Sequence, residues 1–469
     1  MNGRSKYLIK NVGILTVSNF ASKLLIFLLV PLYTSVLSAD EVGLYDIIVS
    51  SLQLALPILT FNIVDALMRF LMEKDQPREV VASIGMKYVA GSLIPMFLFL
   101  VVSSRMELLH AIHGYEFYIF FYYLFNCLYQ YGIQFAKGIE MVSVMGVAGV
   151  LGTITTLTSN IFFLVVVKAG LPGFFLASIL GQAIPSFYLL YKTKLWRFIS
   201  GVKNNRLLQK EMLTYCTPLI ATAIGWWVNS ASDKYVVLFI CGMAANGLLS
   251  VSYKVPAIIN TLQQIFVQAW QISAIKEYGD QDTDIFYGRI FRMINILMVL
   301  AGSILILFAK PMAYVLYQKE FFSAWKYVPY LVVSSVINAA SGILGPILSA
   351  KKASKPMALS AVYGAGTNVV LNIILVYLVG IQGATIATVI SSFIIFAVRK
   401  KAANNEIKIE GYSVILISWM ILGIQATLEI YTRLWWTEVI LVIAVVLLNR
   451  KEIGELYRRC AKHLRKPRL

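Results

Sequence analysis

The chain has 469 residues, of which 59% are hydrophobic and 14% are charged. A soluble domain is usually about half apolar and about a quarter charged. A chain of this size cannot bury so many apolar side chains in its own core, which argues against a soluble enzyme, a nucleic-acid-binding domain or a disordered chain. In so apolar a chain, the formal charge of +18 indicates orientation in a bilayer rather than a nucleic-acid partner.

Long apolar segments follow one another along the chain. A helix needs roughly 20 mostly apolar residues to cross the hydrocarbon core of a bilayer. Fourteen segments meet this requirement, near 11–37, 43–71, 81–103, 115–136, 146–167, 173–191, 212–239, 247–273, 290–312, 328–349, 357–380, 383–398, 412–430 and 434–449. The sequence therefore predicts an all-α polytopic membrane protein with about fourteen transmembrane helices.

The basic residues between these segments are distributed unevenly. Most fall on one side, including the run Arg399-Lys400-Lys401 and the basic tail 450–468, and few, such as Arg105 and Lys310, fall on the other. Because cytoplasmic loops carry the excess of Lys and Arg, we expect a cell-membrane protein with both termini in the cytoplasm. The tail is also suited to contact anionic membrane lipid.

The sequence gives no indication of covalent chemistry. The loops are short, no GxxxxGK[ST] motif occurs, and the four cysteines and three histidines form no metal-ligand pattern. We therefore expect no catalytic residue, no metal site and no cofactor.

Short motifs recur in the two halves of the chain. Gly170-Leu-Pro-Gly173 resembles Gly380-Ile-Gln-Gly383, and Asn160 precedes the first motif much as Asn372 precedes the second. Four such matches keep their order and lie about 204–212 positions apart. They predict a repeat of six spans, and an even number of spans places both copies the same way up in the membrane.

The repeat predicts three parts of the chain. We expect an N-terminal lobe at 1–200 with spans 1–6, and a C-terminal lobe at 201–405 with spans 7–12. Residues 406–469 would add two further spans and the basic cytoplasmic tail. In parallel-repeat transporters the substrate site lies between the lobes.

Charged residues inside the predicted spans concentrate in the first two spans of each repeat. A charge at mid-bilayer costs about 2.5–3.5 kcal/mol on insertion scales, so it usually faces a bundle interior or a wet cavity. The residues are Lys23, Asp46, Asp65, Arg69, Asp233, Lys234 and Lys254. Two simpler interpretations stay open, since Arg69 can extend to water at the helix end and Asp65 can neutralise it at i, i+4.

The eighth span carries a polar stripe flanked by aromatic residues. Its members share one helical face and are Asn260, Gln264, Gln268 and Gln271. The stripe suits a hydroxyl-rich ligand such as a sugar, with Trp227 of the preceding span as an aromatic partner. Hydrogen bonding between helices is the alternative.

Several segments resemble one family. They are Asn19-Phe-Ala-Ser-Lys-Leu-Leu, Val30-Pro-Leu-Tyr-Thr-Ser, Ile63-Val-Asp-Ala-Leu-Met-Arg-Phe, Thr217-Pro-Leu-Ile, Ser232-Asp-Lys-Tyr and the stretch from Gly247 to Pro256. They resemble the bacterial polysaccharide (O-antigen or capsule repeat-unit) flippases of the multidrug/oligosaccharidyl-lipid/polysaccharide exporter (MOP) superfamily. The resemblance implies a two-lobed fold like that of the MATE exporters.

The resemblance also implies a function and roles for the charged residues. Such flippases move an undecaprenyl-diphosphate-linked oligosaccharide across the cytoplasmic membrane, driven by an ion gradient. Their partners include a polysaccharide polymerase and glycosyltransferases. The diphosphate would contact the cations Lys23, Lys254, Lys234 and Arg69. A coupling proton or sodium ion would bind one of the acids Asp46, Asp65 and Asp233. Related lipid II flippases carry arginines where this chain has lysines in spans 1 and 8, so the anion geometry differs.

Three other functions compete with this one. A multidrug exporter of the same fold should have an acidic, apolar pocket, whereas four of the seven charges inside these spans are basic. A lipid II flippase is a second alternative. A membrane polysaccharide polymerase requires a large outer loop, which the sequence lacks.

Overall fold

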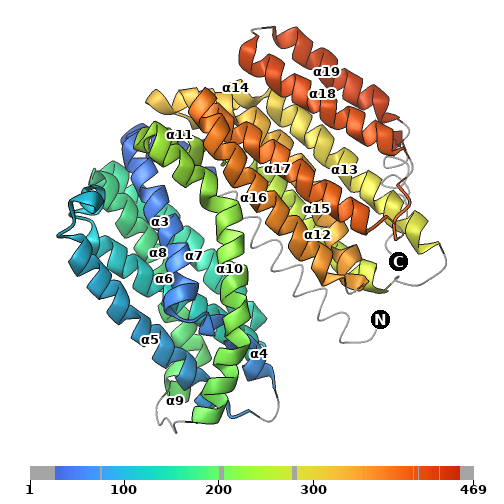
Figure 1. The fold of residues 1–469 in the computed structure, drawn as a ribbon. Coiled ribbons are helices and arrows are strands. Elements are labelled where there is room, and N and C mark those ends of the chain that lie inside the picture. The colour runs from blue at the N-terminus through green and yellow to red at the C-terminus, as the bar shows by residue number, and fades with distance from the viewer. Residues whose placement is uncertain are drawn as a thin grey trace, which may run out of the picture. The chain divides into compact units, whose positions relative to one another are not determined.

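The computed structural model describes residues 27–73, 76–199, 205–276, 282–351, 353–404, 406–409, 411–432, 434–450 and 452–454. Every regular element in these ranges is a helix (Figure 1). The chain forms two compact units, Met1–Ala231 and Ser232–Leu469. The long helix α10 (Arg206–Cys241) contributes to both units.

The first unit contains most of the N-terminal half of the chain. Its helices before α10 are α2 (Val30–Val36), α3 (Ala39–Leu59), α4 (Ile63–Met72), α5 (Arg78–Ser103), η1 (Glu107–Ile112), α6 (Glu116–Gly138), α7 (Val142–Asn160), the π-helix η2 (Ile161–Val166), α8 (Gly170–Thr193) and α9 (Leu195–Ile199).

The second unit begins near the end of α10. Its further helices are α11 (Met243–Ser252), α12 (Ala257–Lys276), α13 (Thr283–Leu307), α14 (Ala309–Leu316), η3 (Lys319–Tyr327), α15 (Val328–Ala350), α16 (Ser354–Val379), α17 (Ile381–Ala402), α18 (Tyr412–Tyr431) and α19 (Trp435–Leu448).

The predicted spans correspond closely to these helices. From residue 43 onward, each predicted span coincides with one helix or with two consecutive helices, whereas most of the first span lies outside the described residues. In the described part of the chain, nine helical segments are long and apolar enough to cross a membrane. An all-helical polytopic membrane protein is therefore confirmed, and the total of fourteen spans stays a prediction.

The second predicted span, 43–71, is divided into α3 and α4. A capping box starts α3, because the Glu41 N–H donates to the Ser38 hydroxyl and the Ser38 N–H donates to the Glu41 carboxylate. Phe61 and Asn62 then adopt left-handed backbone angles, with φ of 52° and 53°. Asn tolerates this conformation better than most residues, so the chain turns here and α4 begins at Ile63.

The same packing order occurs in both units. In the first, α6 packs against α4, α5 and α8, while α7 packs against α8. In the second, α15 packs against α12, α13 and α17, while α16 packs against α17. Gly170 and Gly380 precede the last helix of each set or open it, and their φ angles of +56° and +64° are ones that glycine adopts readily. A six-span repeat predicts such an arrangement, although the orientation of the copies and the three domain bounds stay predictions.

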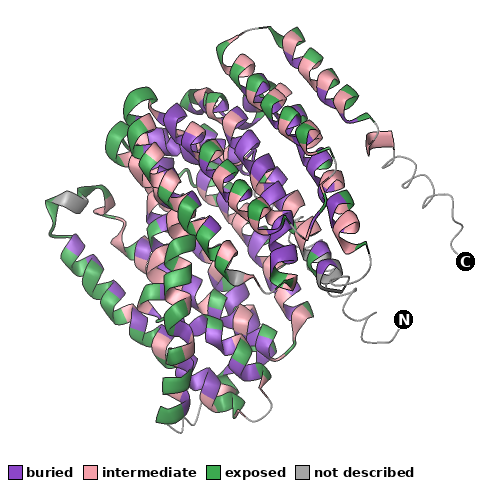
Figure 2. Cartoon of the chain, turned by 45° about the vertical axis from the view of Figure 1, so that its right-hand side comes forward, coloured by how far each residue is buried: buried purple, intermediate pink, exposed green. Residues whose placement is uncertain are grey.

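The last two helices pack beside the second set. α18 and α19 contact each other and α13, and α18 also contacts α15. α15 is buried along almost its whole length, whereas α16 exposes large side chains such as Val362, Tyr377 and Leu378. Exposed residues also follow one side of many other helices (Figure 2). Apolar side chains exposed in this way suit contact with lipid tails.

A close backbone approach joins α13 to the segment before α18. A Cβ on Gly288 would lie 1.9 Å from the Lys408 carbonyl oxygen, and the Lys408 N–H donates to the Asp284 carbonyl at 3.1 Å. We predict that Gly288→Ala destabilises the protein by about 1–3 kcal/mol, because the backbone must move to admit the methyl group. Thermal unfolding of the purified protein in detergent measures this effect.

The matched control is Gly366→Ala on α16, where an added Cβ meets nothing within 4 Å. This control should unfold at the wild-type temperature or above it, because alanine favours helix over glycine. Equal unfolding temperatures for the two variants would contradict the close approach.

Candidate functional site

The predicted site residues divide between the two units. Lys23, the first of the four expected cations, lies outside the described residues. Asp46, Asp65, Arg69 and Trp227 belong to the first unit, whereas the remaining residues belong to the second.

Asp65 and Arg69 lie on α4 but contact different partners. The Asn62 and Gln134 side-chain amides donate to the Asp65 carboxylate at 3.0 and 3.1 Å. Arg69 places its Nε 3.6 Å from a Glu73 carboxylate oxygen, and its guanidinium lies 5.1 Å from the centre of the Tyr215 ring. These contacts give no support to the expectation that Asp65 and Arg69 neutralise each other.

The Arg69 guanidinium is accessible. Its side chain is 60% exposed, and exposed ion pairs contribute only about 0–1 kcal/mol. An incoming anion could therefore compete with Glu73 for the guanidinium, while Tyr215 still holds the planar group from the side.

Asp46 and Trp227 belong to the region around α3. Asp46 is partly buried one turn before Ser50. The Trp227 indole N–H donates to the Ser50 carbonyl at 2.7 Å, which connects α10 to α3. This hydrogen bond occupies the only polar group of the indole, so Trp227 has only its ring face to offer a sugar.

Asp233 is the most buried of the three candidate acids. Its exposed fraction is 4%. The Tyr253 hydroxyl donates to one carboxylate oxygen, and the Lys234 N–H donates to the other at 3.1 Å. Asp65 is exposed and Asp46 is only partly buried. Burial therefore distinguishes Asp233 among the three acids.

A polar network on α16 and α17 begins at the neighbour of Asp233. The Ser232 hydroxyl donates to the Asn368 side-chain oxygen at 2.9 Å, and the Asn372 amide donates to the same oxygen at 2.8 Å. The Asn368 amide lies 3.4 Å from the Ser391 hydroxyl and 3.5 Å from that of Thr388. Oxygen atoms from three helices thus gather close to the residue preceding Asp233.

Sequence reasoning missed most of this network. The repeat motif includes Asn372 alone, although Asn368 and Asn372 are spaced i, i+4 in a mostly apolar helix. Two amides at that spacing on one helix face were the available signal. Their contact with Ser232 crosses 136 sequence positions and has no sequence signature.

Lys234 and Lys254 are both partly buried. Lys234 directly follows Asp233, and Lys254 lies between α11 and α12, next to the Tyr253 that donates to Asp233. Lys254 thus stands in the break between α11 and α12, next in the chain to the donor of Asp233.

The polar stripe on α12 is at least partly accessible. Asn260 is partly buried, Gln264 and Gln271 are exposed, and the side chain of Gln268 lies outside the description. The amide that packs closely against α15 is Gln263, which occupies the space a Cβ on Gly342 would need. Gln263, which is not a member of the stripe, thus contributes to this helix contact.

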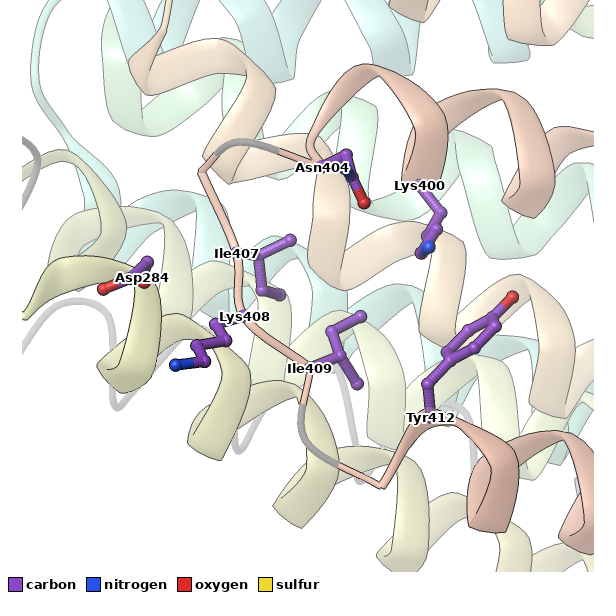
Figure 3. Close-up of a pocket in the computed structure, with 7 residues that line it drawn as sticks. All are labelled: Asp284, Lys400, Asn404, Ile407, Lys408, Ile409 and Tyr412. Atoms are coloured by element: carbon purple, nitrogen blue, oxygen red, sulfur yellow. The ribbon is translucent and has the colours of Figure 1, made fainter.

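A separate polar pocket lies at the junction of α13, α17 and α18. It has a volume of about 340 Å³, and its lining includes Asp284, Lys400, Asn404, Lys408 and Tyr412 (Figure 3). Lys400 points toward Tyr412, with its ammonium 4.6 Å from the ring centre (Figure 3). None of the predicted site residues lines this pocket. Among the residues that the structure describes, no three His, Cys, Asp or Glu side chains are grouped to hold a metal ion.

The sequence over residues 8–271 matches the family described as polysaccharide biosynthesis protein. The chain belongs to this family. The match covers more than half of the chain, which confirms the resemblance drawn from the motifs. No curated protein sequence matches the chain.

Solved structures of related fold cover almost the whole chain. The lipid II flippase MurJ in an inward closed conformation matches with a TM-score of 0.67 at 13% identity, covering 95% of this chain and 99% of that one. A multidrug resistance MATE family transporter of the MOP superfamily in an inward-facing conformation gives 0.65 at 15% identity, over 88% and 96%. A MOP superfamily transporter from Pyrococcus furiosus gives 0.59 at 14% identity, over 90% and 97%.

These comparisons fix the class of the protein. The chain is a multi-pass membrane protein of the polysaccharide biosynthesis family, with the fold of MOP superfamily transporters. The fold shared with MurJ and MATE proteins confirms the MATE-like architecture predicted from the sequence.

The hydrogen bond between Tyr253 and Asp233 can be tested through stability. We predict that Tyr253→Phe costs about 1–3 kcal/mol, because it leaves a buried carboxylate without its side-chain donor. Adding Asp233→Asn should recover part of this loss, because the double variant no longer buries the unpaired charge. Thermal unfolding of the two single variants and the double variant checks this. Strictly additive effects would contradict the contact.

Proposed function

We propose that this protein is a flippase that moves undecaprenyl-diphosphate-linked oligosaccharide repeat units across the cytoplasmic membrane. Its product would supply synthesis of a surface polysaccharide of the capsule or O-antigen type. The observation that carries the proposal is the family match over residues 8–271, because drug exporters share the fold. Glycosyltransferases and a polysaccharide polymerase would act before and after it.

The cations suit a diphosphate substrate. A diphosphate that leaves water requires fixed positive charge and strong hydrogen-bond donors. We assign this role to Lys23, Lys254, Lys234 and Arg69. The contacts of Arg69 support the assignment. Its guanidinium is exposed, and its one ion pair among the described residues joins it to the partly exposed carboxylate of Glu73 at 3.6 Å.

The sugars would contact α12. The accessible amides of Asn260, Gln264 and Gln271 offer both donors and acceptors to hydroxyl groups, and we include Gln268 by its position in the stripe. The ring face of Trp227 would add an apolar surface for a sugar. The lipid tail would remain in the bilayer.

Ion coupling would depend on Asp233 rather than on Asp46 or Asp65. A buried carboxylate with a hydroxyl donor beside it, close to the side-chain oxygens of Ser232 and Asn368, suits a proton or a sodium ion. Binding and release of that ion would bias alternating access between two lobes in a parallel repeat. We place both termini in the cytoplasm, as the charge distribution predicts.

Two other transported substrates remain as alternatives. The fold shared with MATE transporters favours a multidrug exporter, and the match to MurJ favours a lipid II flippase. The four cations among the candidate residues favour an anionic headgroup over a cationic drug. A membrane polymerase is not supported, since the sequence lacks the large outer loop that such an enzyme requires.

The anion-binding role predicts a loss of surface polysaccharide. Lys254→Ala should lower polymer export by about 10- to 100-fold, because a hydrogen bond to a charged group contributes about 1.5–3 kcal/mol. Lys23→Ala and Arg69→Ala should act in the same direction. Surface polysaccharide and cytoplasmic-side lipid-linked intermediate are measured in cells with equal amounts of each variant.

The matched control is Lys137→Ala, an exposed lysine at the end of α6. It should leave export unchanged. Normal polymer at normal protein levels in the Lys23 and Lys254 variants would refute the anion site. If these variants lost drug resistance while surface polysaccharide stayed unchanged, the result would favour the exporter alternative.

The coupling role predicts a different result for Asp233. In proteoliposomes with an imposed proton or sodium gradient, Asp233→Asn should abolish the dependence of flipping on that gradient, because the amide cannot carry the negative charge. Asp65→Asn should retain the dependence. The reverse pattern would transfer the coupling role to Asp65.

A further inference from the structure

Two carboxyl groups lie at the closed end of the α18–α19 hairpin. Glu429 is near the end of α18, and Glu438 is in the first turn of α19. They are the only charged residues in these two helices, which are otherwise apolar. Neither residue belongs to the site proposed for substrate or coupling ion.

Glu438 is buried without a hydrogen-bond partner. Its exposed fraction is 1%, and neither carboxyl oxygen has a partner among the described residues. An ionised carboxylate in such a place loses its hydration with only the amide of Gln425 beside it in exchange, a cost of several kcal/mol or more. The neutral acid avoids this cost.

The neighbouring amide is already engaged with α13. Gln425 lies beside Glu438 and is fully buried. Its side-chain oxygen accepts from the Ser303 hydroxyl at 2.7 Å, and its amide donates to the Ser303 carbonyl at 3.0 Å. Hard metal cations take about six or more oxygen ligands, and this region supplies few. A proton needs only one carboxyl oxygen.

The other charged groups nearby favour a proton on Glu438. Glu429 is only partly buried and lies within electrostatic range of both Glu438 and Lys310 of α14. α15 contains no charged residue, and the charges of α13 lie near its opposite end, at least about 16 Å along the helix from Ser303. Arg433, between the two helices, is outside the described residues. A charged Glu429 beside Glu438 favours the neutral form of Glu438.

We propose that Glu438 is a proton-binding site, separate from the proposed coupling ion, with Glu429 retaining its charge beside Lys310. While Glu438 holds its proton, the first turn of α19 packs against α13 and α18. Loss of the proton places a negative charge in that contact and weakens it. The added helix pair thus carries its own response to pH.

Infrared difference spectroscopy of the purified protein during a pH titration tests the proposal directly. Wild type should show the C=O band of a protonated carboxyl in an apolar environment, and the band should disappear as the pH rises. Glu438→Gln should remove it. Glu429→Gln should retain the band and move its midpoint to lower pH, because it removes a negative charge beside Glu438 and leaves the charge of Lys310 unscreened. A midpoint that moves to higher pH would contradict the proposal. The exposed Glu107→Gln is the matched control and should leave the band unchanged.

Stability against pH gives a second, independent measurement. The folded protein holds a proton that the unfolded chain releases, so stability should fall as the pH rises through the midpoint of the band. Glu438→Gln mimics the neutral acid, should fold, and should lose this dependence. A band that persists in Glu438→Gln, or one that sodium removes at constant pH, would overturn the proposal. Polysaccharide export is not a readout here, so the result does not depend on the proposed function.

Discussion

The cost of placing a polar group in hydrocarbon governs this structure. Many polar side chains described inside the helices are hydrogen-bonded within the protein, because an unpaired group in lipid loses several kcal/mol. Ser and Thr hydroxyls mostly return to the carbonyl one turn earlier, as Thr153 and Thr158 do. Other polar groups are joined across helices, as Gln425 is to Ser303. Polar contacts between helices therefore mark the places where the fold or its function requires them.

Helix breaks position several of the candidate residues. The turn at Phe61 and Asn62 starts α4, whose exposed face carries Asp65 and Arg69, and it brings the Asn62 amide to Asp65. The break between α11 and α12 lies at Tyr253, whose hydroxyl donates to Asp233. In a continuous helix, the 3.6-residue repeat would have fixed the direction of each of these side chains. Breaks of this kind are tolerated in a membrane protein where nearby side chains satisfy the freed backbone groups.

The sequence predicted the helices better than it predicted their contacts. Apolar length marks the long helices from residue 43 onward, because the residues of each such helix suffice to indicate it. The short helices η1, α9 and η3 lie outside the predicted spans. Asp233 was identified from its charge, yet its side-chain donor, Tyr253, is 20 positions away, and the contact of its neighbour Ser232 with Asn368 spans 136. Such contacts depend on which faces of two helices meet, which periodicity does not determine. The pairing of Arg69 with Glu73 instead of Asp65 is a further case, since both acids stand four residues from it and only packing selects between them.

The nearly complete burial of α15 has a consequence for how this chain can vary over evolutionary time. A helix facing lipid on one side can exchange one large apolar residue for another there, as the exposed side of α16 can. α15 has almost no such side, and its neighbours α12, α13, α17 and α18 all constrain the volume of its residues. Homologous sequences should therefore diverge slowly along all of α15 and quickly along the outer side of α16, even though the two helices are almost equally apolar.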